Sequence, residues 1–158
     1  HRDLHSFPTR RSSDLQASRV QPPTRCGSKM PAKRILLIGG LYGLLAVLLG
    51  AFGAHGLREV LSAASLASWQ TGVLYQLVHA PVMLITALWL RHGGPAVLRL
   101  AGLLFALGIL TFSGSIYALV LFNTSWSAWL GPVTPLGGLA LIAGWTCLCV
   151  AALKTQDT

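Results

Sequence analysis

The stretch that decides the fold runs from Ile35 to Leu57 and reads ILLIGGLYGLLAVLLGAFGAHGL. It carries no Asp, Glu, Lys or Arg. A helix needs roughly 20 mainly apolar residues to cross the ~30 Å hydrocarbon layer of a membrane. Three further stretches of this kind follow along the chain, at 73–90, 97–122 and 133–153. The sequence therefore predicts an all-α integral membrane protein, a bundle of four transmembrane helices that forms a single domain over residues 30–158.

Composition supports the same class of protein. The 158 residues are 53% hydrophobic and only 10% charged, which is far too apolar for an ordinary soluble domain. The net charge of +8 is divided equally, because residues 1–29 and residues 30–158 each carry six basic and two acidic side chains. Charge that is spread in this way does not form a nucleic-acid-binding face, so the lipid bilayer is the expected surrounding and nucleic acid is excluded as a partner.

The first 29 residues differ from the rest of the chain. They are rich in Ser, Arg and Pro and show no helical or strand periodicity, so we expect them to be disordered. Because the opening run HRDLHSFPTRRSSDL also resembles a translated sequencing adapter, we interpret this segment as a non-native leader that precedes a natural start at Met30. A basic cytoplasmic tail is the competing interpretation. A cleaved signal peptide fits less well, because the apolar run continues to Leu57.

Basic residues predict the orientation. Arg58, next to Glu59, lies in the first connection, whereas the other basic residues after Met30 all fall on the opposite side of the predicted membrane: Lys33, Arg34, Arg91, Arg99 and Lys154. Connections rich in Lys and Arg stay in the cytoplasm. We therefore expect both termini to be cytoplasmic and the protein to reside in the bacterial inner (plasma) membrane as a multi-pass protein.

The segment from Arg58 to Gln70 allows two interpretations. It mixes Ser, Ala and Leu with one tryptophan, so it is too polar to span the membrane alone. It either forms an interfacial helix on the outer surface or simply extends the second span into the headgroups.

Small residues recur at alternating spacings of four and three in the predicted spans, which places them on single helix faces. Such faces let helix backbones approach closely in lipid. We predict helix packing for them, although glycines that line a transport pathway are the functional alternative. The candidate packing residues are Gly39, Gly43, Gly50 and Gly53 in the first span, Gly108 in the third, and Gly137 and Gly144 in the fourth.

Polar side chains inside the spans gather toward the predicted outer face. This candidate polar layer consists of His55, Tyr75, Gln76, His79, Ser113, Ser115 and Thr134. Helical spacing puts Tyr75, Gln76 and His79 on one face. We expect His79 to lie ~9 Å below the outer end of its span. Gln76, Ser113 or Ser115 are the expected partners of its imidazole.

Two interpretations of His79 remain open: a neutral side chain that fixes helix register, or a functional ionisable group in the membrane. Haem or metal ligation by His55 and His79 is awkward, because their depths differ by about two helical turns. We predict no metal site, no cofactor and no catalytic residue, since the spans contain no Asp or Glu. Cys147 and Cys149 are interpreted as small packing residues.

Together these features favour a non-enzymatic membrane protein that binds a lipid or a partner helix. The partner would be a second copy of the chain or another membrane protein. The alternative is a small oligomeric transporter or channel that uses the polar layer around His79. A membrane enzyme or a haem protein is the third hypothesis.

Several short motifs are distinctive when taken together: GAFGAHG at 50–56, YQ at 75–76, FSGSIY at 112–117, TPLGG at 134–138 and GW at 144–145. With them, the chain from Met30 to Leu153 resembles the family of small bacterial inner-membrane proteins known as domain of unknown function 423, to which animal transmembrane protein 256 is similar. The resemblance implies four membrane-spanning helices. It implies no established activity and no cofactor.

Overall fold

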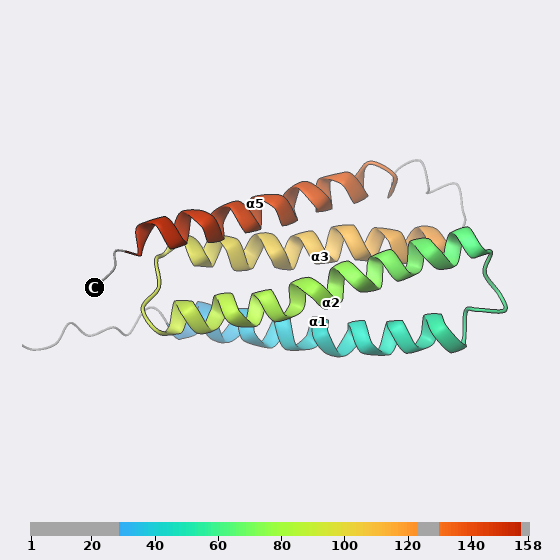
Figure 1. Cartoon of the computed structure of the whole chain (residues 1–158), viewed down its shortest axis with the longest axis horizontal. Coiled ribbons are helices and arrows are strands. Elements are labelled where there is room, and N and C mark those ends of the chain that lie inside the picture. The colour runs from blue at the N-terminus through green and yellow to red at the C-terminus, as the bar shows by residue number, and fades with distance from the viewer. Residues whose placement is uncertain (1–28, 123–129, 156–158) are drawn as a thin grey trace, which may run out of the picture.

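The computed structural model describes residues 29–122 and 130–155, and the regular structure within them is entirely α-helical. The helices are α1 (Lys29–His55), α2 (Ala63–Arg91), α3 (Val97–Phe122) and α5 (Val133–Lys154) (Figure 1). Each of the four is long and apolar enough to cross a membrane. The predicted all-α class with four spans is therefore confirmed. The leader prediction falls on residues 1–28, which lie outside the described ranges, whereas Lys29 already belongs to α1.

The second predicted span, 73–90, needs a correction at its first end. Helix α2 begins at Ala63 rather than at residue 73, and it continues without a break to Arg91. Ser62 caps it, because its hydroxyl accepts a hydrogen bond from the Ser65 backbone amide at 3.1 Å. The segment is thus an extension of the second span and not a separate interfacial helix.

The polar side chains that made this segment look too polar for a span form hydrogen bonds within the helix itself. The hydroxyls of Ser68 and Thr71 each donate to the backbone carbonyl four residues earlier, at 3.1 and 3.0 Å. A hydroxyl that is bonded in this way costs little in an apolar environment. Hydropathy alone counts these side chains as polar, so it places the start of the span too late.

The helices form a zigzag and not a closed square. Helix α1 packs on α2, α2 packs on α3, and α3 packs on α5, while α1 and α3 meet more lightly. Figure 1 shows α2 crossing between α1 and α3, with α1 and α5 at the two edges. This arrangement leaves the flanks of α1 and α5 open to lipid, and it creates grooves between helices that are not direct neighbours.

The candidate packing glycines of α1 all face α2. A Cβ atom on Gly39 would lie within 3.0–3.3 Å of Leu84, Met83 and Ala80, and one on Gly53 would lie 2.6 Å from the Trp69 ring. Gly43 and Gly50 contact the same helix more loosely. Close van der Waals contact along this face is what holds α1 in place, because lipid supplies no hydrophobic drive between helices.

The α3/α5 interface interlocks in both directions. Leu141 of α5 lies on Gly108, and Phe105 of α3 lies on Gly144. Gly137 rests directly on the backbone of Phe112. These contacts adjoin the main apolar core, which includes Met83, Leu98, Phe105, Ile109 and Leu141 and extends toward the end of the molecule where α1 begins.

That end, which we call the basic end, carries Lys33, Arg34, Arg91, Arg99 and Lys154. We propose that it faces the cytoplasm. Alkaline phosphatase fused after Thr158 is then expected to stay inactive in bacteria, because this enzyme matures only outside the cytoplasm, whereas a green fluorescent protein at the same position should fluoresce. The opposite pair of signals would place the basic end outside.

Candidate functional site

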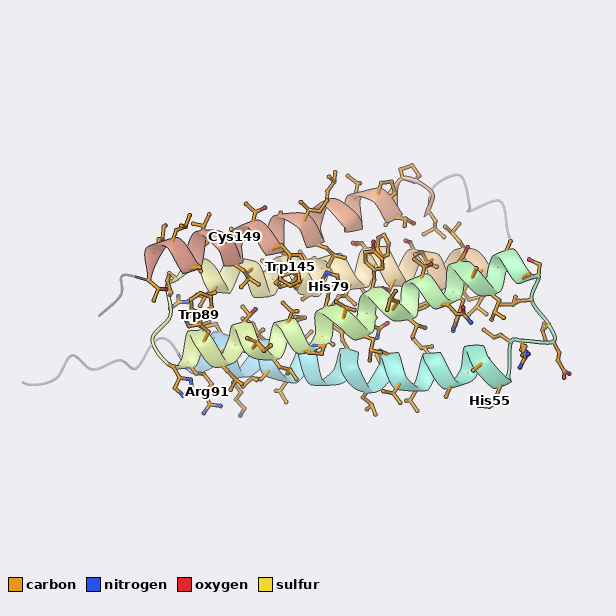
Figure 2. All side chains as sticks on the ribbon, in the orientation of Figure 1. His55, His79, Trp89, Arg91, Trp145 and Cys149 are labelled. Carbon is orange, nitrogen blue, oxygen red and sulfur yellow. The ribbon has the colours of Figure 1, made fainter. Side chains whose placement is uncertain are left out.

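The structure separates the predicted polar layer into buried and exposed members. Gln76, His79, Ser113 and Ser115 are buried, Thr134 is half-buried, and Tyr75 is 39% exposed. His55 is exposed at the end of α1, far from His79, as Figure 2 shows. It therefore lies apart from the other six residues of the predicted layer.

Gln76 joins three helices. Its Nε2 donates to the backbone carbonyl of Tyr42 in α1 at 2.9 Å, and its Oε1 accepts from the Tyr117 hydroxyl of α3 at 3.0 Å. Tyr42 in turn donates its hydroxyl to the carbonyl of Ala106 at 2.9 Å. Both ends of the Gln76 amide are thus occupied, and the side chain fixes the positions of α1, α2 and α3 relative to one another.

The two buried serines make separate bridges. Ser113 donates to the carbonyl of Gly72 at 2.8 Å and so ties α3 to α2. The hydroxyls of Ser115 and Thr134 lie 2.7 Å apart and tie α3 to α5. Neither serine contacts His79, so the expectation that Ser113 or Ser115 would be its partner is wrong, and so is the expectation for Gln76.

The partners of His79 are Tyr75 and Trp145. The Trp145 indole Nε1 donates to the His79 Nε2 at 3.1 Å, and the His79 Nδ1 lies 2.7 Å from the Tyr75 carbonyl oxygen. An indole N–H can only donate, so Nε2 must hold a lone pair. The imidazole is therefore neutral with its proton on Nδ1, from which it donates to the carbonyl. His79 thereby links α2 to α5 (Figure 2).

His79 also lies deeper than predicted. Because α2 begins at Ala63, the histidine is ~24 Å from that end of the helix and ~18 Å from Arg91 at ~1.5 Å per residue. It lies near the middle of α2 and not ~9 Å from the end of this helix. The polar layer is consequently a band that runs from the middle of α2 toward the end opposite the basic end.

Hydrogen bonds satisfy this band internally. Among the described residues, no buried side-chain nitrogen or oxygen lacks a partner. The interhelical hydrogen bonds described above connect different helices. They favour one arrangement of the helices over others that lipid alone would allow with similar free energy. The arrangement can therefore hold the helices in register.

One face of the band opens into a groove. The α2/α5 groove has a volume of about 450 Å³, and its lining is formed by Leu74, Tyr75, Val78, His79, Phe112, Gly138, Leu141, Ile142 and Trp145. Phe112 of α3 forms its floor and stacks against Tyr75 with ring centroids 4.4 Å apart. With both nitrogens of His79 and the indole of Trp145 engaged, the Tyr75 hydroxyl is the polar group of the groove that bonds to none of the described residues.

Trp145 and Phe112 were not predicted as site residues. Trp145 is 44% exposed and makes edge-to-face contacts with His79 and Phe105. A tryptophan in the middle of a span, away from the interfaces where this residue is usual, is the signal that could have identified it. The pairing itself depends on how α5 is placed against α3.

Metal ligands do not gather in the part of the chain that the structure describes, which holds no group of three or more His, Cys, Asp or Glu side chains. Cys147 packs against the apolar core, as a small packing residue would. Cys149 is exposed instead, so its interpretation as a packing residue is wrong. The two thiols lie on different faces of α5.

Four apolar spans held together by small-residue faces and interhelical hydrogen bonds define a multi-pass α-helical membrane protein. The chain belongs to the family described as Protein of unknown function (DUF423), whose model matches residues 49–138. That range includes every residue of the predicted polar layer and most of the α2/α5 groove.

The relatives are bacterial membrane proteins. The chain is 42% identical to the UPF0382 membrane protein YwdK of Bacillus subtilis (strain 168) over 123 residues, which cover 77% of this chain and 98% of the relative. It is 34% identical to the UPF0382 inner membrane protein YgdD of Escherichia coli (strain K12) over 127 residues, covering 80% and 95% of the two chains. No solved structure matches. The chain is therefore a multi-pass protein of the bacterial inner membrane.

Proposed function

We propose that this protein is a non-catalytic membrane protein that binds an apolar lipid molecule in the α2/α5 groove. The observation that carries the proposal is the groove itself, which lies between α2 and α5 near the middle of both helices. Its walls are aliphatic and aromatic, and the Tyr75 hydroxyl offers one hydrogen bond to a polar group on the bound molecule. Ligand sites with a few polar groups in an apolar lining commonly have volumes of ~300–1,000 Å³.

A lipid suits the groove better than a partner helix does. Helices associate in membranes through small residues that let backbones approach, and the small-residue faces of α1 and α5 are already occupied by α2 and α3. The groove instead presents the bulky side chains of Leu74, Val78 and Ile142. Flexible acyl or isoprenoid chains fill such irregular apolar surfaces.

The described spans also favour binding over chemistry. They contain no carboxylate, and Glu59, in the connection between α1 and α2, lies outside them. His79 uses both nitrogens to join α2 and α5. A general base or a metal ligand would need one of these nitrogens free.

Lipid retained during purification tests the proposal. Val78→Trp places an indole in the α2/α5 groove, so we expect it to remove most of the lipid that is bound to the wild-type protein after mild detergent extraction, as measured by mass spectrometry of organic extracts. The matched control is Ile85→Trp. Ile85 is an exposed residue of the same helix, two turns away from Val78, and it does not line the groove. It should retain the wild-type amount. Equal retention by both variants would reject the groove as the site.

Transport is the second candidate, because His79 is an ionisable side chain near the middle of α2 that also lines the groove. In sealed vesicles we expect the same proton and solute leakage with the protein as without it. Flux that depends on the protein and disappears in His79→Ala would replace the binding proposal with a transport function.

A further inference from the structure

A second groove lies at the basic end, on the opposite side of the zigzag. It runs between α1 and α3 and has a volume of about 330 Å³. We call it the α1/α3 groove; its lining is formed by Pro31, Arg34, Ile35, Ile38, Met83, Arg99, Gly102, Leu103 and Ala106. Met83, which is fully buried, belongs to α2 and contributes to its floor. Apart from the two arginines, the lining is apolar.

The dimensions of this groove follow from the helix geometry. From Arg99 to Ala106 it extends ~10 Å along α3. Tyr42, one turn beyond Ile38, donates its hydroxyl to the carbonyl of Ala106 and so ties α1 to α3 at the deep end. The Ile35 side chain of α1 lies on Gly102 and closes the groove there, while the small side chain of Ala106 leaves space beside Ile38. The shape is a short apolar channel that is open to lipid along its length and charged at its mouth.

The charge at the mouth is positive, and the described residues supply no acidic side chain at this end. Arg34 and Arg99 come from two different helices and line the same groove. Within the described ranges the basic end holds no Asp or Glu, since Glu59 lies at the other end. Two arginines that line one groove favour an anion between them, because guanidinium binds phosphate through paired hydrogen bonds.

We propose that the α1/α3 groove binds one anionic phospholipid, with its phosphate between Arg34 and Arg99 and the first part of an acyl chain against Ile38 and Ala106. Basic pockets between transmembrane helices are suited to anionic lipid headgroups. The apolar channel directly below the two arginines distinguishes a phospholipid from a free phosphate, which has no chain to place there.

The other basic residues of this end do not combine these features. Lys33 and Arg91 line a separate cavity with His92 and Leu88, and Lys154 lies at the end of α5 beside the α2–α3 connection. These cavities carry charge without an apolar channel of comparable extent. They serve as internal controls, because their substitution changes the charge of the basic end and leaves the α1/α3 groove unaltered.

Native mass spectrometry of the purified full chain tests the inference. We expect adducts of dioleoyl phosphatidylglycerol to exceed those of dioleoyl phosphatidylcholine by about tenfold or more, given two arginines at the headgroup. Arg34→Gln combined with Arg99→Gln should abolish this preference. Lys33→Gln combined with Lys154→Gln removes the same charge from the same end and should preserve it. Equal losses in the two double variants would show diffuse attraction and overturn the site.

A pair of tryptophan substitutions tests the shape of the groove independently of its two arginines. Leu103→Trp fills the α1/α3 groove from an exposed position and should remove phosphatidylglycerol binding with both arginines intact. Leu107→Trp, one turn farther along α3 and outside the groove, should not. Unchanged binding in Leu103→Trp, or displacement of the lipid by excess inorganic phosphate, would overturn the proposal. The test is independent of the α2/α5 groove, because none of these residues lines it.

Discussion

Replacement of Gly137 by leucine is expected to separate α5 from α3 and to lower the free energy of unfolding by about 3 kcal/mol or more. A Cβ atom at this position would overlap the backbone nitrogen of Phe112 and would lie 2.8 Å from its Cα and 2.7 Å from the Thr111 hydroxyl oxygen. Overpacking usually costs ~1–3 kcal/mol, because side chains rotate away. Backbone atoms in the middle of a helix cannot do so, and we therefore expect a cost at or above this range.

The adjacent residue supplies the matched control. A Cβ atom on Gly138 would lie 3.8 Å from the Phe112 ring, which is an ordinary contact distance. Gly138→Ala should therefore leave stability unchanged or raise it by up to ~1 kcal/mol, since alanine favours a helix over glycine. Reversible unfolding of the detergent-solubilised protein, followed by circular dichroism, measures both changes. Similar stabilities for Gly137→Leu and Gly138→Ala would show that α5 is not packed as described.

Trp69→Ala is the second substitution with a large expected effect, about 3–5 kcal/mol of lost stability. The Trp69 side chain is 1% exposed, and the Cδ1–Nε1 edge of its indole packs against Gly53 of α1. Its ring also lies against that of Tyr117 of α3, with centroids 4.6 Å apart and an angle of 47° between the planes. Its indole also donates to the Leu49 carbonyl at 3.0 Å. Alanine would leave a cavity where three helices meet, and dispersion contacts are the main cohesive force between helices in lipid.

Trp145→Ala is the control for Trp69→Ala, because it removes the same side chain from a partly exposed position. Trp145 is nearly half exposed in the α2/α5 groove, so lipid can occupy the space that its ring leaves, and we expect less than half of the loss. Trp69→Phe keeps most of the ring volume and should cost only about 1 kcal/mol for the hydrogen bond. The same unfolding experiment ranks the three variants. A loss in Trp145→Ala as large as that in Trp69→Ala would contradict the burial of Trp69 between α1 and α3.

The positions of the spans were predictable because apolar length is a local property. The third predicted span, 97–122, coincides with α3, and the fourth ends one residue before α5 does. The second span failed at its first end, where Ser68 and Thr71 return their hydroxyls to the helix backbone. A hydropathy scale assigns each of these side chains the free-energy cost of placing it alone in lipid. It leaves out the hydrogen bond to the helix backbone, which removes most of that cost.

The sequence predicted which residues belong to the candidate site, but it did not predict their hydrogen-bond partners. Gln76, His79, Ser113 and Ser115 stood out because polar side chains inside a span need partners, and all four are buried. Which partners they have depends on the rotation and offset of whole helices. His79 consequently bonds to Trp145 of α5, although Ser113 and Ser115 are closer in sequence.

By itself, the sequence determined that this protein crosses the membrane four times, because each apolar run must satisfy its own backbone as a helix in lipid. It also determined which end is basic and which residue types are polar within the spans. Only the tertiary structure decided that the helices form an open zigzag with two grooves, one lined by His79 and Trp145 and the other by Arg34 and Arg99. Lipid gives no direction to helix association, so interlocking contacts such as those at Gly108, Gly137 and Gly144 select one arrangement among many of similar apolar burial.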